Sequence, residues 1–329
     1  MGRANLLSFW HGFFSRSRGK ESRSKGKESR SRWKESRSKG KESRSRGKES
    51  SQSESDVALL EGKNDKYDGI IVEPASLPSD PSKFQAMLKK SLAHWKTESK
   101  KGIWLKLPIE NVDFAPAAVK EGFKYHHAEK DYLMLTCWIS DSPCTLPANA
   151  SHQVGIGAMV INDENKILVV QEATGPTKGS GNWKIPTGVV SQGEDVNEAA
   201  EREVKEETGV DAEFVEVLGV RQTHTAPFGK SDIFFLCLLR PKSADVVKQD
   251  TEIAAVQWMP VEEYRSQEFN ARSELMKRFA DIITALSKQQ YTGFMPERLL
   301  MGSRGPGAFF YHNTRDINRL SAKESLPEE

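Results

Sequence analysis

The chain has 329 residues, with 48 Lys and Arg against 46 Asp and Glu, and this length accommodates two domains of common size. No run of apolar residues approaches the 18 needed to cross a bilayer, so the sequence predicts no membrane span. The three cysteines, Cys137, Cys144 and Cys237, have no metal-ligand spacing and no paired framework, which indicates a reducing compartment.

Basic charge is concentrated at the N-terminus. Residues 1–56 hold 16 Lys and Arg against 7 Asp and Glu, whereas the rest of the chain holds 32 against 39. Within residues 20–50 the sequence KESRS recurs every seven residues, in the repeats KESRSKG, KESRSRW, KESRSKG and KESRSRG, and Trp33 is the one large apolar residue among them. Such a repeat cannot bury a coiled-coil seam, which needs two apolar positions in seven. We therefore predict that residues 1–65 are a disordered, low-complexity basic tail with KESRSxG repeats.

The function of this tail stays open at the level of sequence. One hypothesis is an electrostatic arm that contacts nucleic acid or another anionic surface. The other is an expanded tail without a dedicated partner, because a glutamate in every repeat dilutes the positive charge. Residues 1–19 join three arginines to an apolar patch, as a transit peptide does. We expect a cytoplasmic protein, with delivery to an organelle through residues 1–19 as the alternative.

Residues 66–140 predict a small α/β domain. Strands are predicted at residues 68–72, 103–107 and 132–139, and helices around residues 84–95 and at residues 115–122. The helical prediction around Leu88 follows from apolar residues at spacings of three and four. Residues 141–151, which contain Pro143 and Pro147, then predict a linker.

A second α/β domain is predicted over residues 152–290. Strands are predicted at residues 154–161, 166–171, 212–223, 231–239 and 254–259, and helices at residues 195–208 and 271–287. Residues 162–165 predict a hairpin-type turn between the first two strands. The composition loosens after Gln290, so we predict that residues 291–329 are a flexible C-terminal tail.

Three glutamates of the helix at residues 195–208 carry the strongest chemical signal. Glu203, Glu206 and Glu207 are three and four residues apart, so their carboxylates share one helical face. Like charges this close are unfavourable alone, but a hard divalent cation such as Mg²⁺ or Mn²⁺ reverses the balance. Arg202 is placed to pair with Glu194 or Glu206. The other face carries valines and alanines that can pack on a sheet.

Two glycines frame this helix. Gly209 stands where a left-handed residue would end it. Gly188 permits a close approach of the backbone to a metal or a phosphate. A solvated acidic helix is the alternative interpretation of the glutamates, but it does not explain the spacing of these glycines, Glu194 and the run Arg202–Val210.

Gly188, Glu194 and the run REVKEETGV at residues 202–210 resemble the Nudix box at every fixed position. The resemblance to Nudix hydrolases implies an α/β/α sandwich and cleavage of a diphosphate linkage in nucleoside diphosphate derivatives. It also implies that Glu203, Glu206 and Glu207 bind Mg²⁺ or Mn²⁺, with the Gly188 carbonyl as a further ligand. Arg202 and Glu194 would orient these ligands. The base would be a carboxylate of the helix or one from a later loop, for which Glu252 is the candidate.

The resemblance extends over residues 66–290 to the plant Nudix group that includes ADP-ribose and NADH pyrophosphatases. This group is related to the animal protein encoded antisense to basic fibroblast growth factor. The stretches YDGIIV at residues 67–72, GIWLKLP at 102–108 and LPANASH at 146–152 carry it. Residues 66–140 would then be a pre-Nudix domain whose fold resembles acetyltransferases. It lacks a glycine-rich loop for acyl-CoA, which favours a role in homodimerisation or regulation.

Substrate contacts are harder to assign from sequence. Lys184 and Arg221 are candidates for holding the diphosphate, and Phe228 for stacking on adenine, although each could equally be a surface or core residue. The adjacent His126 and His127 would face opposite ways on a strand, which favours a structural role. ADP-ribose and NADH are the expected substrates. CoA, a capped RNA, or an interaction protein that retains the fold are the alternatives.

Overall fold

The computed structural model describes residues 57–299, apart from 176 and 225, and residues 307–318. The chain divides into two compact units at the junction of Ala150 and Ser151. The expectations for the repeats and for residues 1–19 fall outside the described residues. Among the described helices, none combines the length and the apolar character needed to cross a bilayer.

The N-terminal domain is built on a five-stranded sheet with the order β1-β2-β3-β5-β4. Its strands are β1 (Gly62–Asn64), β2 (Ile70–Val72), β3 (Gly102–Pro108), β4 (Lys124–Ala128) and β5 (Tyr132–Trp138). The β2–β3 pair is parallel and the other pairs are antiparallel. The three predicted strands and both predicted helices are present. The structure also contains β1 and β4, which were not predicted.

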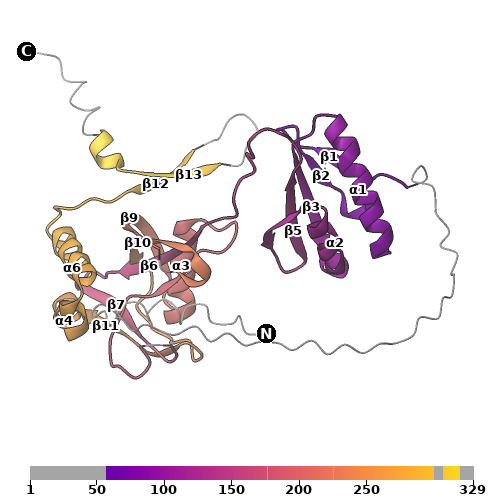
Figure 1. The fold of residues 1–329 in the computed structure, drawn as a ribbon. Coiled ribbons are helices and arrows are strands. Elements are labelled where there is room, and N and C mark those ends of the chain that lie inside the picture. The colour runs from indigo at the N-terminus through magenta and orange to yellow at the C-terminus, as the bar shows by residue number, and fades with distance from the viewer. Residues whose placement is uncertain (1–56, 176, 225, 300–306, 319–329) are drawn as a thin grey trace, which may run out of the picture. The chain divides into compact units, whose positions relative to one another are not determined.

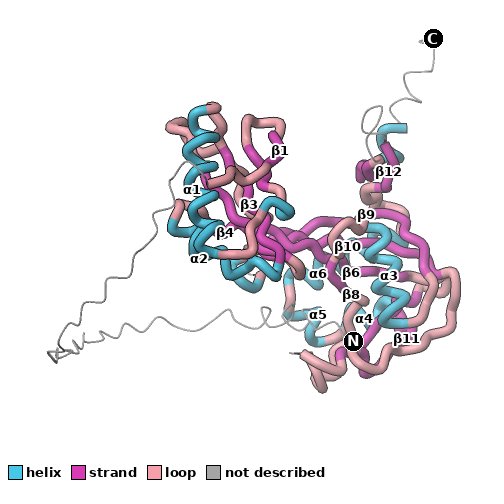
Figure 2. Tube along the Cα trace, turned by 90° about the vertical axis from the view of Figure 1, so that its right-hand side faces the viewer, coloured by secondary structure: helices cyan, strands magenta, loops and turns pink. Residues whose placement is uncertain are grey.

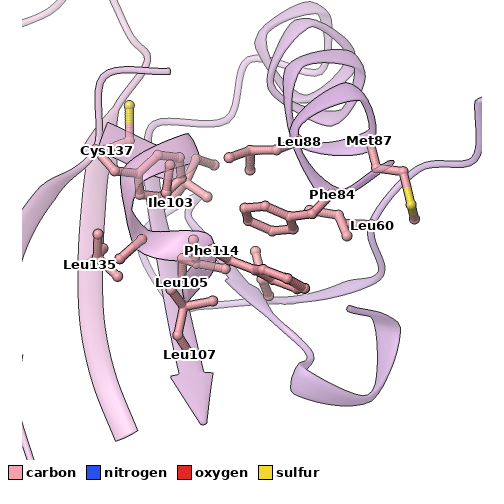
Figure 3. Packing of buried hydrophobic residues seen from close by; sticks show 14 of the residues in the cluster. Leu60, Phe84, Met87, Leu88, Ile103, Leu105, Leu107, Phe114, Leu135 and Cys137 are labelled. Atoms are coloured by element: carbon pink, nitrogen blue, oxygen red, sulfur yellow. The ribbon is translucent and has the colours of Figure 1, made fainter. Parts of the chain in front are cut away.

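Helices α1 (Pro81–Thr97) and α2 (Ala115–Lys120) lie on the same side of this sheet (Figures 1 and 2). Asp80 caps α1 by accepting a hydrogen bond from the backbone N of Lys83 at 3.0 Å. The apolar face of α1 then buries Phe84 and Leu88 completely. The Phe84 ring stacks on Phe114 with 4.7 Å between centroids (Figure 3), so this core is aromatic at its centre.

The folded part begins before residue 66. Leu60 is buried in the core of this domain, and its backbone N donates to Ser91 Oγ at 2.8 Å. Lys90 Nζ donates to the carbonyl of Val57 at 2.6 Å. The first part of the predicted tail therefore belongs to the N-terminal domain. The sequence conceals this because β1 is an exposed edge strand without apolar alternation.

The two adjacent histidines do not face opposite ways, and that expectation was wrong. A register shift in the β4–β5 pair falls between Tyr125 and His127. A bulge of this kind changes the alternation of side chains, and the Nδ1 atoms of His126 and His127 lie 2.6 Å apart. His126 Nε2 bonds to the carbonyl of Pro147 and His127 Nε2 to the Tyr132 hydroxyl, both at 3.1 Å. The pair therefore links the strand to the following segment, a structural role.

The second unit is a mixed α/β domain with two main sheets and helices on both sides. Its four-stranded sheet has the order β8-β6-β10-β9, and a two-stranded sheet joins β11 to β7. The strands are β6 (His152–Val160), β7 (Lys166–Glu172), β8 (Thr187–Val189), β9 (Ala212–Thr223), β10 (Ser231–Pro241) and β11 (Ile253–Pro260). Strands β6 and β10 are parallel neighbours, and β9 pairs antiparallel with β10.

Strands β6 and β7 do not form the expected hairpin. The turn is present, since Asn165 N donates to the Asn162 carbonyl at 3.1 Å. Beyond the single bridge between Ile161 and Ile167, however, β6 pairs with β10 and β8, whereas β7 pairs with β11. Turn chemistry predicts a reversal of the chain, but long-range pairing decides which strands become neighbours.

Helix α3 (Val196–Thr208) and helix α6 (Glu274–Ser287) cover opposite faces of the four-stranded sheet (Figure 1). Buried residues of α3 pack with Ile156 of β6 and Cys237 of β10. Phe279 and Ile283 of α6 pack with a different set that includes Leu218 and Leu236. Two short helices, α4 (Val261–Ser266) and α5 (Glu268–Arg272), precede α6, so the predicted helix at 271–287 begins three residues late, where Ser273 caps it.

The segment after Gln290 contains regular structure, where a flexible tail was predicted. Strands β12 (Met295–Leu299) and β13 (Ala308–His312) pair antiparallel. Before them, Phe294 forms a two-way backbone bridge with Val217 at 2.9 Å, and Gly293 N donates to Glu216 Oε2 at 3.0 Å. The edge of β9 therefore holds the start of this segment, a long-range contact that local composition does not reveal.

Candidate active site

Helix α3 presents three glutamates because its other face is fixed in the core. Ala199, Ala200 and Val204 are fully buried against the sheet. Gly209 ends the helix with φ of 72°, the left-handed conformation predicted for it. With the helix closed at its end and packed along one face, the rotation of α3 is set, and Glu203, Glu206 and Glu207 project from the remaining surface.

These glutamates differ in burial. Glu203 and Glu207 are 6% and 4% exposed, while the Glu206 side chain is half exposed. Burial raises the pKa of Glu203, and it raises the pKa of Glu207 to about 8 even though the nearby Lys184 charge lowers it. Glu207 Oε2 is buried without a hydrogen-bond partner. This site therefore gathers carboxyl groups whose ionised form the protein does not fully compensate.

Arg202 orients the carboxylates around it. Its guanidinium binds Glu194 through two hydrogen bonds, Nε to Oε1 at 2.6 Å and Nη2 to Oε2 at 2.9 Å. Nη1 donates to Glu203 Oε1 at 2.7 Å and to Glu206 Oε2 at 3.1 Å. The Arg202 hydrogen bond is also the main reason that the pKa of Glu194 is lowered. The pairing expected from sequence is present, and it extends to Glu203.

Gly188 makes room for the close approach of a side chain, while the approach of its backbone to a metal or a phosphate stays a prediction. It lies in β8 opposite Ile156 of β6. A Cβ atom at this position would stand 1.8 Å from Cδ of Glu203. Only glycine leaves room for the Glu203 carboxyl between β8 and α3, so the first and the central parts of the box fit together sterically.

The donor set fits a divalent cation. Among the described residues, no three His, Cys, Asp or Glu side chains already converge as a metal-holding group, and Arg202 supplies the positive charge between Glu203 and Glu206. The Oε2 atom of Glu207 is nevertheless a buried acceptor that has no hydrogen-bond partner. Carboxylate oxygens of this kind are the ligands that Mg²⁺ and Mn²⁺ prefer.

A residue that sequence analysis missed, Glu172, stands at the end of β7. It accepts a hydrogen bond from Lys184 Nζ at 2.5 Å and another from Thr177 Oγ1. Both members of the Lys184–Glu172 ion pair are largely buried, with side chains 14% and 10% exposed. Lys184 Nζ also donates to Thr187 Oγ1 at 3.0 Å. Its charge acts on Glu207, so the ion pair belongs to the surroundings of the α3 glutamates.

Glu252 reaches the same region from the loop before β11. Its carbonyl accepts from Ala173 N at 2.7 Å, which ties the loop to the end of β7. Burial raises the pKa of Glu252, and the charge of Glu206 raises it further. Glu252 is thus within electrostatic range of the box, as its candidacy requires.

The three candidates for substrate binding, Lys184, Arg221 and Phe228, do not all lie in one place. Lys184 and Arg221 line one small cavity, whose other walls are mostly apolar and aromatic: Ile185, Thr187, Phe234, Tyr264, Phe269, Asn270, Leu275, Met276 and Phe279. The Arg221 guanidinium bonds Asp232 at 2.6 Å and lies over the Phe234 ring at 4.7 Å. Phe228 is not part of this lining. It is 92% exposed, on a turn with φ of 60°.

Comparison with known proteins gives concordant matches in sequence. The family model described as NUDIX domain matches residues 151–279, and one described as Nudix hydrolase domain matches residues 60–139. The chain is 51% identical to Nudix hydrolase 2 of Arabidopsis thaliana over 80% of its length and 94% of the relative's. It is 38% identical to human nucleoside diphosphate-linked moiety X motif 6, over 64% of this chain and 67% of that one.

Solved structures show a partial likeness. A NUDIX hydrolase from Nitrosomonas europaea is 25% identical and aligns with a TM-score of 0.35, over 43% of this chain and 92% of that one.

Proposed function

Because this chain belongs to the Nudix hydrolase family and is a pyrophosphatase of nucleoside diphosphate derivatives, we propose that its substrates are ADP-ribose and NADH. Each would be cleaved at its diphosphate linkage with release of AMP. The single observation that carries this proposal is the juxtaposition of the carboxylate face of α3 with the buried Lys184, which also lines an apolar and aromatic cavity. Such a site offers cation-binding oxygens, a phosphate partner and a surface for a ring.

Glu203, Glu206 and Glu207 hold the divalent cation in this proposal, with the Gly188 carbonyl as a further ligand and Mg²⁺ or Mn²⁺ as the ion. When bound, the ion neutralises the diphosphate and makes a water molecule more acidic. Arg202 keeps Glu203 and Glu206 in place through its hydrogen bonds. Glu252 is the base that we propose for the attacking water, since burial and the charge of Glu206 both raise its pKa, which favours proton uptake by its carboxylate.

Lys184 and Arg221 bind the substrate beside the α3 carboxylates in this proposal. The Lys184 ammonium is held by Glu172 and Thr187, where it can meet a phosphate oxygen. The cavity that both cations line has a volume of about 50 Å³, so it accepts the edge of a ring rather than a whole base. Phe228, at its exposed position, would contact a base only from outside this cavity.

The test is an assay of the purified protein with Mg²⁺ or Mn²⁺ against ADP-ribose, NADH, CoA and a capped RNA. We expect AMP from ADP-ribose and NADH at the highest kcat/KM, and no turnover in EDTA. Turnover confined to CoA or capped RNA would overturn the substrate assignment. A homodimer through the N-terminal domain and a nucleic-acid contact by the tail stay predictions.

A further inference from the structure

A second cavity of the catalytic domain lies on the side of its four-stranded sheet that faces α6. Its volume is about 540 Å³, within the range of small-molecule sites. Part of its wall is aliphatic: Ile161, Val215, Leu238, Leu239, Ile283 and Leu286. None of its lining residues belongs to the Nudix box or to the cavity beside Lys184. The cavity takes its helical wall from α6, and none of the α3 glutamates lines it.

Glu216 of β9 gives this cavity a buried carboxylate. It lines the cavity and is 1% exposed, and the two residues that follow it in β9, Val217 and Leu218, are equally buried. Its Oε2 accepts from Gly293 N at 3.0 Å. Its Oε1 is buried and has no hydrogen-bond partner. An acceptor left in this state costs folding free energy that a leucine here would avoid, whereas a ligand with an N–H donor would satisfy it.

Two arginines determine what else the ligand must carry. Arg240 and Arg315 line the same cavity, and Arg315 Nη2 is 3.8 Å from Glu216 Oε2. Two positive charges in the lining of one cavity disfavour a simple organic cation, so the N–H donor should be neutral. The same arginines favour an anionic group such as a phosphate. Tyr291 completes the lining, fixed by its hydroxyl bond to the Leu218 carbonyl.

We propose that this cavity is a second ligand site, for a nucleoside monophosphate with an amino-substituted base. The amino N–H donates to Glu216 Oε1, the base packs between the aliphatic residues of β10 and α6, and the phosphate meets Arg240 and Arg315. The proposed function enters only in the choice of AMP as the probe, because AMP is the expected product. A site of this kind would let the domain respond to product without occupying the α3 site.

Binding of AMP to the full-length Glu207→Gln variant in EDTA tests the proposal, because metal-dependent binding at the α3 site is then removed. Isothermal titration calorimetry should give one AMP per chain with a Kd below about 1 mM. Adenosine, which lacks the phosphate, and ribose 5-phosphate, which lacks the amino group, should each bind about tenfold or more weakly. No detectable binding of AMP would overturn the proposal whether or not the wild-type protein cleaves ADP-ribose.

Two further substitutions locate the site. Glu216→Gln cannot serve both Gly293 N–H and a ligand N–H, since one side of the amide is a donor, so it should weaken AMP binding about tenfold. Arg240→Ala changes an exposed position and should weaken it by a similar factor without risk to folding. Glu213→Gln on the same strand and Arg278→Ala on α6, both at exposed positions outside the cavity, are the matched controls.

Methyl NMR spectra complete the test. Addition of AMP should shift the signals of Ile283 and Leu286, which line this cavity, and leave that of Ile185, which lines the cavity beside Lys184. Shifts at Ile185 alone, or an AMP affinity that is unchanged by both Glu216→Gln and Arg240→Ala, would place AMP elsewhere and refute the second site.

Discussion

The two domains bury different chemistry. In the N-terminal domain the buried polar residues are Ser91 and Thr136, and Ser91 both accepts from Leu60 N and donates to the Met87 carbonyl at 2.8 Å. The catalytic domain buries carboxylates: Glu203, Glu207, Glu216 and Asp232. Three of these four keep a buried oxygen without a hydrogen-bond partner, the exception being Glu203.

This difference distinguishes residues that stabilise a domain from residues that serve its chemistry. A buried carboxylate with an unmet acceptor lowers stability, and the core of the N-terminal domain shows that the chain can be packed without one (Figure 3). We propose instead that the unmet acceptors of Glu207 and Glu216 are positions at which a ligand completes the structure.

Glu207→Gln should lower kcat by about 10³-fold, because it removes a charge that the bound cation requires. The fold should persist, since the substitution deletes a buried charge without a full partner rather than a stabilising contact. Steady-state kinetics and thermal unfolding in EDTA measure the two effects. Glu263→Gln on the exposed surface of α4 is the control. A variant with full activity would remove Glu207 from the catalytic site.

Phe84→Ala should destabilise the N-terminal domain by about 3 kcal/mol, because it deletes a fully buried ring stacked on Phe114. Urea unfolding followed by fluorescence measures the loss, and Tyr67→Ala, at an 81% exposed position, is the control. The kcat of the catalytic domain should not change at temperatures where the variant is folded. A parallel fall in kcat would show that the N-terminal core contributes to catalysis.

Gly188→Ala should lower kcat by about 10²-fold, because the added Cβ displaces the Glu203 carboxyl. Gly219→Ala on β9 is the matched control, since a Cβ there meets nothing within 4 Å and its φ is ordinary. The measurement is kcat of both variants at saturating Mn²⁺. Equal activity of the two would mean that the fit between β8 and α3 is not needed for turnover.

Glu172→Gln should raise the Mg²⁺ concentration for half-maximal rate by about tenfold, as breaking a buried ion pair leaves Lys184 free to approach Glu207 and compete with the cation. The measurement is a metal titration at fixed substrate. Glu164→Gln, which breaks the exposed pair with Lys166, is the control and should have almost no effect. An unchanged metal requirement in Glu172→Gln would limit Glu172 to a structural role.

Much of the fold follows from local pattern. The apolar spacing of α1, the apolar-rich runs of β9 and β10, and the glycine at the end of α3 each predict the element that the structure contains. The edge strands β1 and β4 were missed because exposed strands need no apolar alternation. The short helices α4 and α5 and the strand β12 were missed because tertiary packing, not periodicity, holds them.

For the site, helical spacing is a local property of the chain, so the sequence already placed Glu203, Glu206 and Glu207 on one face of a helix. It also placed Arg202 within reach of its neighbouring carboxylates. Three features emerged from the fold alone: the charge of Lys184, paired with Glu172, acts on Glu207, Gly188 makes room for Glu203, and Glu216 lines a cavity. Each of these depends on pairing between distant strands, which carries no signature in local spacing.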